Sequence, residues 1–155
     1  MQLVFRQAAA ADVDAMFDVR AATRENPISR ETLARSGITP DSLRAWIAAG
    51  TQRGWVCERA QAIVGFCNVD PANGEVVVLA VLPQFERRGI GRELLARAVA
   101  WLQQAGHRRI WLTTDPSAAV RSHGFYRAQG FAPTGVRIAS GDEELVYAPA
   151  APRDT

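Results

Sequence analysis

Residues 81–95 have the sequence VLPQFERRGIGRELL and join a hydrophobic run to a helical pattern through a basic turn with two glycines. The run before the turn, from Val76 to Leu82, is rich in β-branched residues and predicts a strand buried on both faces. Beyond the turn, apolar residues at helical spacing predict an amphipathic helix: Leu94, Leu95, Ala98, Val99 and Leu102.

The turn itself has the composition of a phosphate site. A helix N-terminus presents unpaired backbone N–H groups and the positive end of the helix dipole. Gly89 and Gly91 allow a bound group to approach the backbone closely, and the neighbouring arginines add positive charge. The predicted cradle for a pyrophosphate consists of Arg87, Arg88, Gly89, Ile90, Gly91 and Arg92.

With this segment the sequence resembles the GNAT superfamily of acyl-CoA-dependent N-acetyltransferases, whose signature has V-x-P, a basic pair and then G-x-G at the start of a helix. A second segment, with Phe125-Tyr126 followed by Gly130-Phe131, resembles the family's F-Y-x-x-x-G-F. The chain departs from the family pattern at Glu86, Ala119 and Ser122, where Gln or Arg, Asn and Ala are usual.

The resemblance implies a GNAT fold, which is an α+β domain with a central mixed, mostly antiparallel sheet of about seven strands flanked by about four helices. Strands that outnumber helices and first arrive as hairpins favour the same class. We expect a single domain over residues 1–150 and a frayed tail over 151–155. Strands are predicted at 2–7, 54–59, 63–70, 75–82, 109–113, 131–138 and 144–147, and helices at 12–24, 41–49, from the turn to 104, and at 117–129.

The resemblance also implies that acetyl-CoA is the co-substrate and that its acetyl group moves to an amine by direct attack in a ternary complex. In this family a Tyr at the position of Tyr126 acts as general acid for the departing thiolate, and a phenol with an unperturbed pKa of about 10 suits that role. The structural alternative for Tyr126 is packing beside Phe125. His123, one helical turn earlier, could take a proton or stabilise charge beside Tyr126, and its alternative is a surface position on the helix.

A general base is harder to place from the sequence. The family often uses a carboxylate on the fourth strand, and Glu75 is the candidate at that strand's edge. Asp70, Glu58 and a bound water are the alternatives, and each carboxylate has a solvated or ion-paired role as its structural explanation. The backbone groups of Leu79 and Val81 are implied to contact the pantetheine arm and the thioester carbonyl.

Acceptor specificity is expected in the loop that contains Arg24, Glu25 and Asn26, where Glu25 could pair with an amine and Arg24 with a carboxylate. An ordinary polar loop whose entry is fixed by Pro27 is the alternative. The implied acceptor is a small-molecule or peptide amine. The rival function is a non-catalytic acyl-CoA-binding sensor, whereas a nucleotide-binding P-loop is disfavoured because G-x-x-x-x-G-K-[ST] is absent.

Charge, hydropathy and cysteine usage limit the kinds of partner, compartment and metal site that the sequence predicts. The net charge is only +2 and the basic residues are dispersed, so nucleic acid is not an expected partner. No apolar run approaches the roughly 18 residues of a membrane span, so a cytoplasmic protein without a membrane partner is expected. Cys57 and Cys67 lack metal-ligand spacing, which predicts buried free thiols and no metal. A homodimer is the commonest closed assembly, and the sequence leaves it open.

Overall fold

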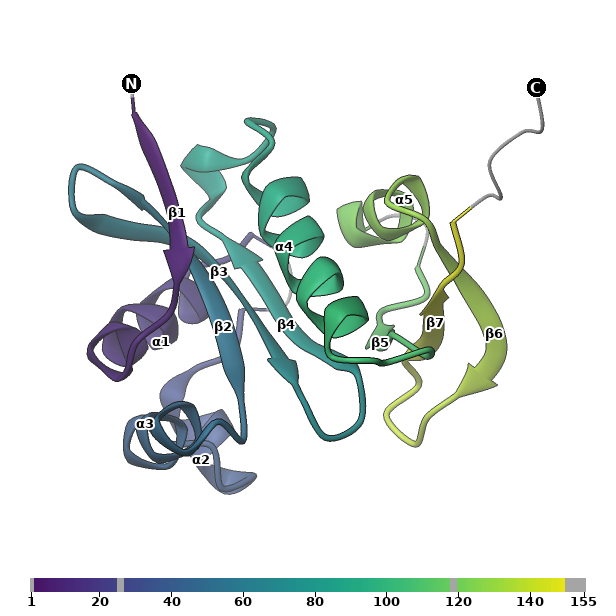
Figure 1. Cartoon of the computed structure of the whole chain (residues 1–155), viewed down its shortest axis with the longest axis horizontal. Helices are drawn as coiled ribbons and strands as arrows, with labels where there is room; N and C mark the ends of the chain where they lie inside the picture. The colour runs from purple at the N-terminus through teal and green to yellow at the C-terminus, as the bar shows by residue number, and fades with distance from the viewer. Residues whose placement is uncertain (1, 25–26, 118–119, 150–155) are drawn as a thin grey trace. The chain divides into compact units, whose positions relative to one another are not determined.

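The computed structural model describes residues 2–24, 27–117 and 120–149, and the chain divides into two compact units, residues 1–107 and 108–155 (Figure 1). The first unit contains β1 (Leu3–Gln7), η1 (Ala10–Asp12), α1 (Val13–Ala21), α2 (Arg30–Arg35), α3 (Pro40–Ala49), β2 (Arg53–Arg59), β3 (Ala62–Asp70), β4 (Glu75–Val81), η2 (Pro83–Phe85) and α4 (Ile90–Gln104). The second unit contains β5 (Trp111–Thr114), α5 (Arg121–Ala128), β6 (Phe131–Arg137) and β7 (Glu143–Tyr147).

The first unit is built on an antiparallel sheet in the order β1-β2-β3-β4. Val56, Phe66 and Ala80 lie side by side on neighbouring strands and belong to the buried cluster formed with α1. The next rung contains Gly65, where an added Cβ would lie 3.2 Å from Ile90 Cγ2 of α4. Because side chains alternate along a strand, α1 and α4 cover opposite faces of this sheet (Figure 1).

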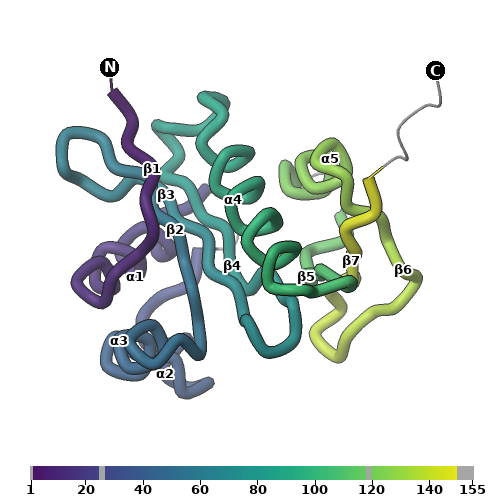
Figure 2. Tube along the Cα trace, viewed as in Figure 1, coloured from purple at the N-terminus to yellow at the C-terminus, as the bar shows by residue number. Residues whose placement is uncertain are grey.

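The second unit is a smaller antiparallel sheet in which β7 pairs with both β5 and β6 (Figure 2). Helix α5 packs against β6. Leu145 and Phe131 are buried, and the rings of Phe131 and Tyr147 lie 5.3 Å apart. Together the described parts of the two units contain seven strands and five α-helices, and the neighbouring strands within each unit pair antiparallel. The predicted α+β class is therefore confirmed, while a single domain over residues 1–150 stays a prediction.

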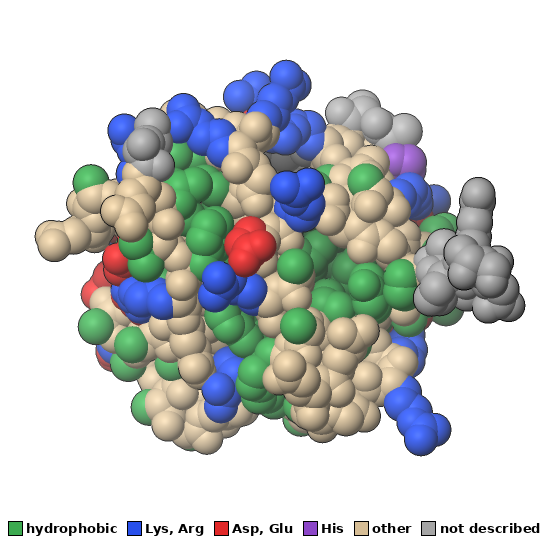
Figure 3. All heavy atoms as spheres, turned by 45° about the horizontal axis from the view of Figure 1, so that its top comes forward, with side chains coloured by type: hydrophobic (Ala, Val, Ile, Leu, Met, Phe, Trp, Pro, Cys, Tyr) green, Lys and Arg blue, Asp and Glu red, His purple; other side chains and the backbone are tan. Residues whose placement is uncertain are grey.

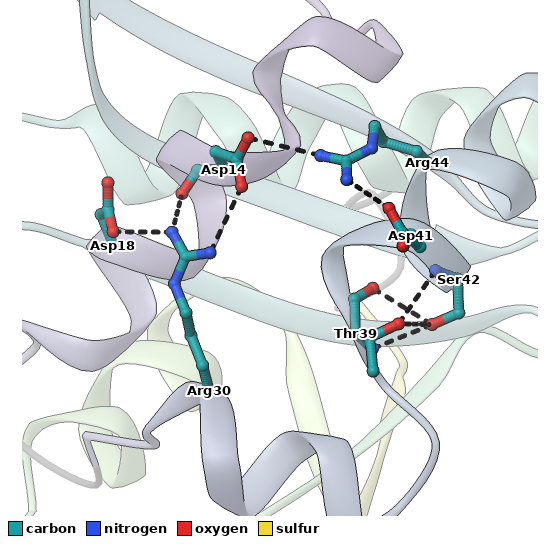
Figure 4. A network of polar contacts seen from close by, with 7 residues as sticks. All are labelled: Asp14, Asp18, Arg30, Thr39, Asp41, Ser42 and Arg44. Atoms are coloured by element: carbon teal, nitrogen blue, oxygen red, sulfur yellow. Dashed lines mark hydrogen bonds and ion pairs between the residues drawn. The ribbon is translucent and has the colours of Figure 1, made fainter.

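Ion pairs connect the three helices at the start of the chain (Figure 4). Arg30 of α2 lies 3.3 Å from Asp14 and 3.0 Å from Asp18, both on α1. Arg44 of α3 lies 3.3 Å from the other oxygen of Asp14 and also pairs with Asp41. These pairs are exposed to solvent and screened by it, so each contributes little to stability.

The start of α3 confirms the predicted helix there, shifted by one residue. The hydroxyl of Thr39 accepts a hydrogen bond from the Ser42 backbone N–H at 3.1 Å, and the Ser42 hydroxyl accepts one from the Thr39 N–H at 2.9 Å (Figure 4). This reciprocal capping satisfies two N–H groups that a helix N-terminus would otherwise leave unpaired. Pro40 follows at the first helical position, where its missing N–H costs nothing.

Three helix predictions differ from the structure, the first being the helix predicted at 12–24, which ends at Ala21. The sequence predicts no helix between residues 24 and 41, but the described part of this segment contains α2, whose Ser29 cap accepts a hydrogen bond from the Thr32 N–H. With six residues and only Leu33 buried, α2 is too short to show a periodic pattern. The helix expected from Ser117 begins at Arg121, because Ser117 donates its N–H to the Asp115 carboxylate in a local turn.

The two cysteines are buried free thiols on the paired strands β2 and β3, as predicted. Burial raises the pKa of Cys67 to about 12, so its thiol stays protonated and unreactive at neutral pH. In the described ranges, no helix combines the length and the apolar character that a membrane crossing requires.

Candidate functional site

The predicted phosphate cradle is a turn that runs from the end of β4 through η2 to the first residue of α4 (Figure 2). Arg87 has a φ of 62° and Gly89 a φ of 80°, so the backbone is left-handed at two positions just before the helix. The Glu93 N–H donates to the Gly89 carbonyl at 3.0 Å and makes the first bond of the helix. The N–H groups of residues 90–92 therefore have no acceptor within the helix and are available to an anion.

Arginine side chains surround this turn. Those of Arg87, Arg88 and Arg92 are exposed, and Figure 3 shows exposed arginines over the side of the molecule on which α4 begins. The Arg88 guanidinium lies 5.3 Å from the ring centre of Phe85, and that of Arg59 lies 5.5 Å from the same ring. Sequence reasoning missed Arg59 because it reaches the turn from the β2–β3 hairpin, and no local pattern signals that approach.

Arg24, which the sequence predicts to bind the acceptor, forms an ion pair with Glu86 in the turn before α4. Its Nε lies 3.3 Å from Oε2 of Glu86, and the Glu86 side chain is only 16% exposed. Glu86 is one of the three positions at which the chain departs from the family pattern, and Arg24 of the loop after α1 supplies a cation beside it. Glu25 and Asn26, the other predicted acceptor residues, lie outside the described residues.

Strand β4 contains an irregularity that the sequence did not show. Val69 pairs with Val76 and Asn68 pairs with Val78, so Val77 has no partner across the ladder and forms a bulge. Beyond the bulge, Leu79 pairs with Cys67 and Val81 with Gly65. Leu79 and Val81 are half-buried and share the face of the sheet that α4 covers. The structure thus brings these two predicted residues and the turn into one continuous segment.

The candidate bases differ in how their carboxylates are engaged. Glu58 accepts hydrogen bonds from Arg6 at 2.9 and 2.6 Å, and Arg6 also binds Asp12. Asp70 accepts a hydrogen bond from the N–H of Ala72 at 2.8 Å in a turn. Glu75 lies beside Asp70 in the ladder and is half-buried; burial, and then the Asp70 charge, raise its pKa above the usual value of a glutamate. The raised pKa keeps Glu75 as the candidate base, and this role stays a prediction.

Tyr126 lies on α5 in the second unit and is half-buried. Its ring is 5.2 Å from that of Phe125 and 6.0 Å from that of Phe131. His123 is half-buried one turn earlier, and its carbonyl accepts a hydrogen bond from Arg127. The aromatic contacts fit the packing role of Tyr126 and leave its hydroxyl role as a prediction.

Residues 14–131 match the model of the Acetyltransferase (GNAT) family, and the chain belongs to this family. It is similar to the mycothiol acetyltransferase of Gordonia bronchialis, with 33% identity over 85 residues that make up 53% of this chain and 28% of that protein. The corresponding protein of Beutenbergia cavernae is 38% identical over 72 residues, which make up 46% of this chain and 24% of that protein. The matched region thus spans about a quarter of these curated relatives.

Solved structures show the same fold over almost the whole chain. The PaiA N-acetyltransferase of Thermoplasma acidophilum, in complex with coenzyme A, has a TM-score of 0.79 at 17% identity and covers 96% of this chain and 99% of its own. YncA of Salmonella typhimurium, solved with acetyl-CoA, has a TM-score of 0.69 at 19% identity and covers 99% of both chains. The predicted GNAT fold is confirmed.

Proposed function

We propose that this chain transfers the acetyl group of acetyl-CoA to the amine of a small-molecule or peptide acceptor. The observation that carries the proposal is the turn before α4, where the left-handed Gly89 precedes N–H groups that have no acceptor within the helix. A pyrophosphate fits there because its oxygens match the N–H groups, and because Arg87, Arg88 and Arg92 supply positive charge. The family match over residues 14–131 supports the assignment.

Strand β4, which leads into the turn, is proposed to position the rest of the cofactor. With the pyrophosphate at residues 87–92, the pantetheine arm would run beside β4, where the backbone groups of Leu79 and Val81 are proposed to bind it and the thioester carbonyl. The bulge at Val77 changes the direction of the strand next to this point. Acetyl-CoA supplies an activated acetyl group, so the protein mainly has to position the reactants and move two protons.

The proposed reaction uses one base and one acid. Glu75, directly or through a water, takes the proton of the amine, whose nitrogen attacks the thioester carbonyl. The carbon–sulfur bond then breaks, and Tyr126 donates a proton to the departing thiolate. Glu75 suits the first role because its raised pKa brings it closer to the pH at which a carboxylate both ionises and accepts a proton.

Replacement of Glu75 by Gln is expected to lower kcat/KM by about 10²–10⁴-fold. Since the base must be ionised, wild-type activity should fall as the pH drops through the raised pKa of Glu75, and the variant should lose this acid limb. Asp70→Asn is the matched control: burial still raises the pKa of Glu75, but the smaller contribution of the Asp70 charge is removed, so the limb should move to lower pH. An acid limb that is unchanged in Glu75→Gln would assign the base to another group.

Stability measurements separate this effect from misfolding. The folded-state pKa of Glu75 is raised, so its stabilising contribution is present at low pH and is lost as the pH rises through that pKa. A neutral glutamine avoids the cost of a half-buried ionised carboxylate. At pH 7 the Tm of Glu75→Gln should therefore be equal to or higher than that of the wild type.

Because Arg24 and Glu86 form an ion pair, we expect substitutions of these two residues to have non-additive effects on the binding of coenzyme A. In Arg24→Ala the Glu86 carboxylate loses this cation and repels the phosphates, so the Kd of coenzyme A should rise about three- to tenfold. Glu86→Gln removes the repulsion, and the double variant should bind as well as Glu86→Gln alone. Calorimetric titration of coenzyme A into the four proteins measures the cycle, and additive effects would show that the pair has no part in binding.

The decisive test is the release of coenzyme A thiol from acetyl-CoA in the presence of amines, amino acids and short peptides. Turnover with one class of acceptor supports the proposal. Binding of acetyl-CoA without turnover on any acceptor would favour a non-catalytic sensor. Absence of binding would overturn the assignment of the turn.

A further inference from the structure

A cavity of about 30 Å³ lies in the first unit, between the N-terminal helices and the face of the sheet formed by β3 and β4. Much of its wall is apolar and includes Met16 of α1, Phe66 of β3 and Val77 of β4. A single water needs roughly 10–15 Å³ of such space, so the cavity has room for a few heavy atoms, the size of a carboxylate. Its polar lining consists of Arg20, Gln52 and Asn68.

Arg20 is half-buried on α1, and the structure gives its guanidinium no hydrogen bond or ion pair with any described residue. Arg30 and Arg44, which reach α1 from the neighbouring helices, each pair with Asp14 (Figure 4). Burial lowers the pKa of Arg20, because desolvation disfavours the charged form. Within this layer of helices Arg20 is thus a cation whose counter-charge the described residues do not supply.

Asn68 is the second unusual group in the cavity wall. It is 1% exposed, its Nδ2 lies 3.9 Å from Met16 Sδ, and its Oδ1 has no hydrogen-bond partner among the described residues. The neighbouring strand makes room for it: a Cβ added to Gly54 would lie 2.0 Å from Oδ1. A buried carboxamide in an apolar wall is unfavourable unless polar partners join it, which points to an occupied cavity.

The cavity adjoins the strand on which the proposed reaction takes place. Val77 and Val78 line it, and Val77 is the bulged residue of β4. Leu79, proposed to contact the pantetheine arm, follows directly on the same strand. The Leu79 side chain faces the other side of the sheet, but its backbone lies within two residues of the cavity wall along β4, so a group bound in the cavity would lie across the strand from the path proposed for the thioester.

We propose that this cavity binds an oxyanion of the acceptor, so that the acceptor is a small amine that also carries a carboxylate or a phosphate. Arg20 pairs with the oxyanion, and Asn68 Oδ1, which needs a hydrogen-bond donor, accepts a bond from an N–H group of the acceptor. A guanidinium suits this task because its N–H groups match the two oxygens of such an anion. This inference rests on the proposed acetyl transfer, whose acceptor it specifies.

The test compares Arg20→Gln with wild type on matched probes. These are L-leucine, L-leucinamide and the phosphonate analogue of leucine, which share the amine and side chain and differ in the anionic group. Wild type should prefer the carboxylate or the phosphonate over the amide by at least about tenfold in kcat/KM, and which of the two it prefers identifies the anion. Arg20→Gln should abolish this preference mainly by raising KM, and should leave the Kd of coenzyme A unchanged.

Two further variants serve as controls for the effect of Arg20→Gln. Arg44→Gln removes an arginine that is paired on the surface and should keep the preference. Arg20→Lys keeps the charge without the two-pronged geometry and should keep part of it, which also provides a readout if Arg20→Gln does not fold. The inference would be overturned if the wild type had the same kcat/KM for the anionic probes and the amide, or if Arg20→Gln kept the wild-type preference.

A direct titration distinguishes failure of this inference from failure of the proposed function. Calorimetry with L-leucine, its phosphonate analogue and L-leucinamide, in the absence of acetyl-CoA, measures recognition of the anion without turnover. Binding of an anionic probe that depends on Arg20 supports the cavity even if no acetyl transfer occurs. Turnover of L-leucinamide without discrimination against it supports the proposed function and overturns this inference, as does the absence of binding and turnover for both anionic probes.

Discussion

Replacement of Tyr126 by Phe is expected to lower kcat by about 10²–10⁴-fold and to leave the Kd of acetyl-CoA unchanged. The change removes only the hydroxyl that is proposed to donate a proton to the departing thiolate. The ring stays, together with its contacts to Phe125 and Phe131 at 5.2 and 6.0 Å. Steady-state kinetics on the best acceptor, together with calorimetric titration of acetyl-CoA, separates a loss of chemistry from a loss of binding.

The chain offers a matched control for this variant. Tyr147 is its other tyrosine, and its ring lies 5.3 Å from the same Phe131. Tyr147→Phe removes a hydroxyl from a second ring that packs against Phe131, and it should change kcat less than about threefold. Equal effects of the two changes would assign Tyr126 to packing, and an enzyme fully active without the Tyr126 hydroxyl would need another acid.

Substitution of Gly89 should have a comparable effect on cofactor binding. At a φ of 80° an alanine costs about 1 kcal/mol of conformational strain, and its Cβ would intrude where the phosphates are proposed to approach the backbone. The Kd of coenzyme A should rise at least about tenfold, which corresponds to about 1.4 kcal/mol. Gly89→Pro should abolish binding, because proline fixes φ near −65° and cannot adopt the left-handed conformation.

Gly50 provides the control for the strain alone. It ends α3 with a φ of 77°, and a Cβ there would meet nothing within 4 Å. Gly50→Ala should therefore lower the Tm about as much as Gly89→Ala while it leaves the Kd of coenzyme A unchanged. Similar affinities for coenzyme A in the two variants would show that the turn before α4 does not hold the phosphates.

The sequence predicted β2, β3, β4 and α4 to within about one residue, because each has a strong periodic pattern and a turn at its ends. It failed at α2, where a single buried leucine leaves no period to detect. It also placed the start of α5 too early, because the Asp115 carboxylate binds the Ser117 N–H and favours a turn there. These errors arise where a short-range hydrogen bond, rather than burial, decides the local backbone.

Some parts of the candidate site could be predicted from local sequence, and others depend on contacts between distant residues. The turn of residues 87–92 and the start of α4 could be predicted because the glycines, the arginines and the helix start are consecutive in the chain, so local backbone geometry alone forms them. The pair of Arg24 with Glu86 could not be predicted, nor could the approach of Arg59 to Phe85. Each joins residues that are far apart in the sequence and that meet only when strands and helices pack.

The sequence by itself thus determined the family, and it predicted the turn before α4 as a phosphate site and the candidate acid and base, since these depend on residue types at fixed spacing. Only the tertiary structure decided the bulge at Val77 and the cavity that brings Arg20 and Asn68 together. Strand register and helix packing set those positions, and both result from the burial of many side chains at once rather than from any local pattern.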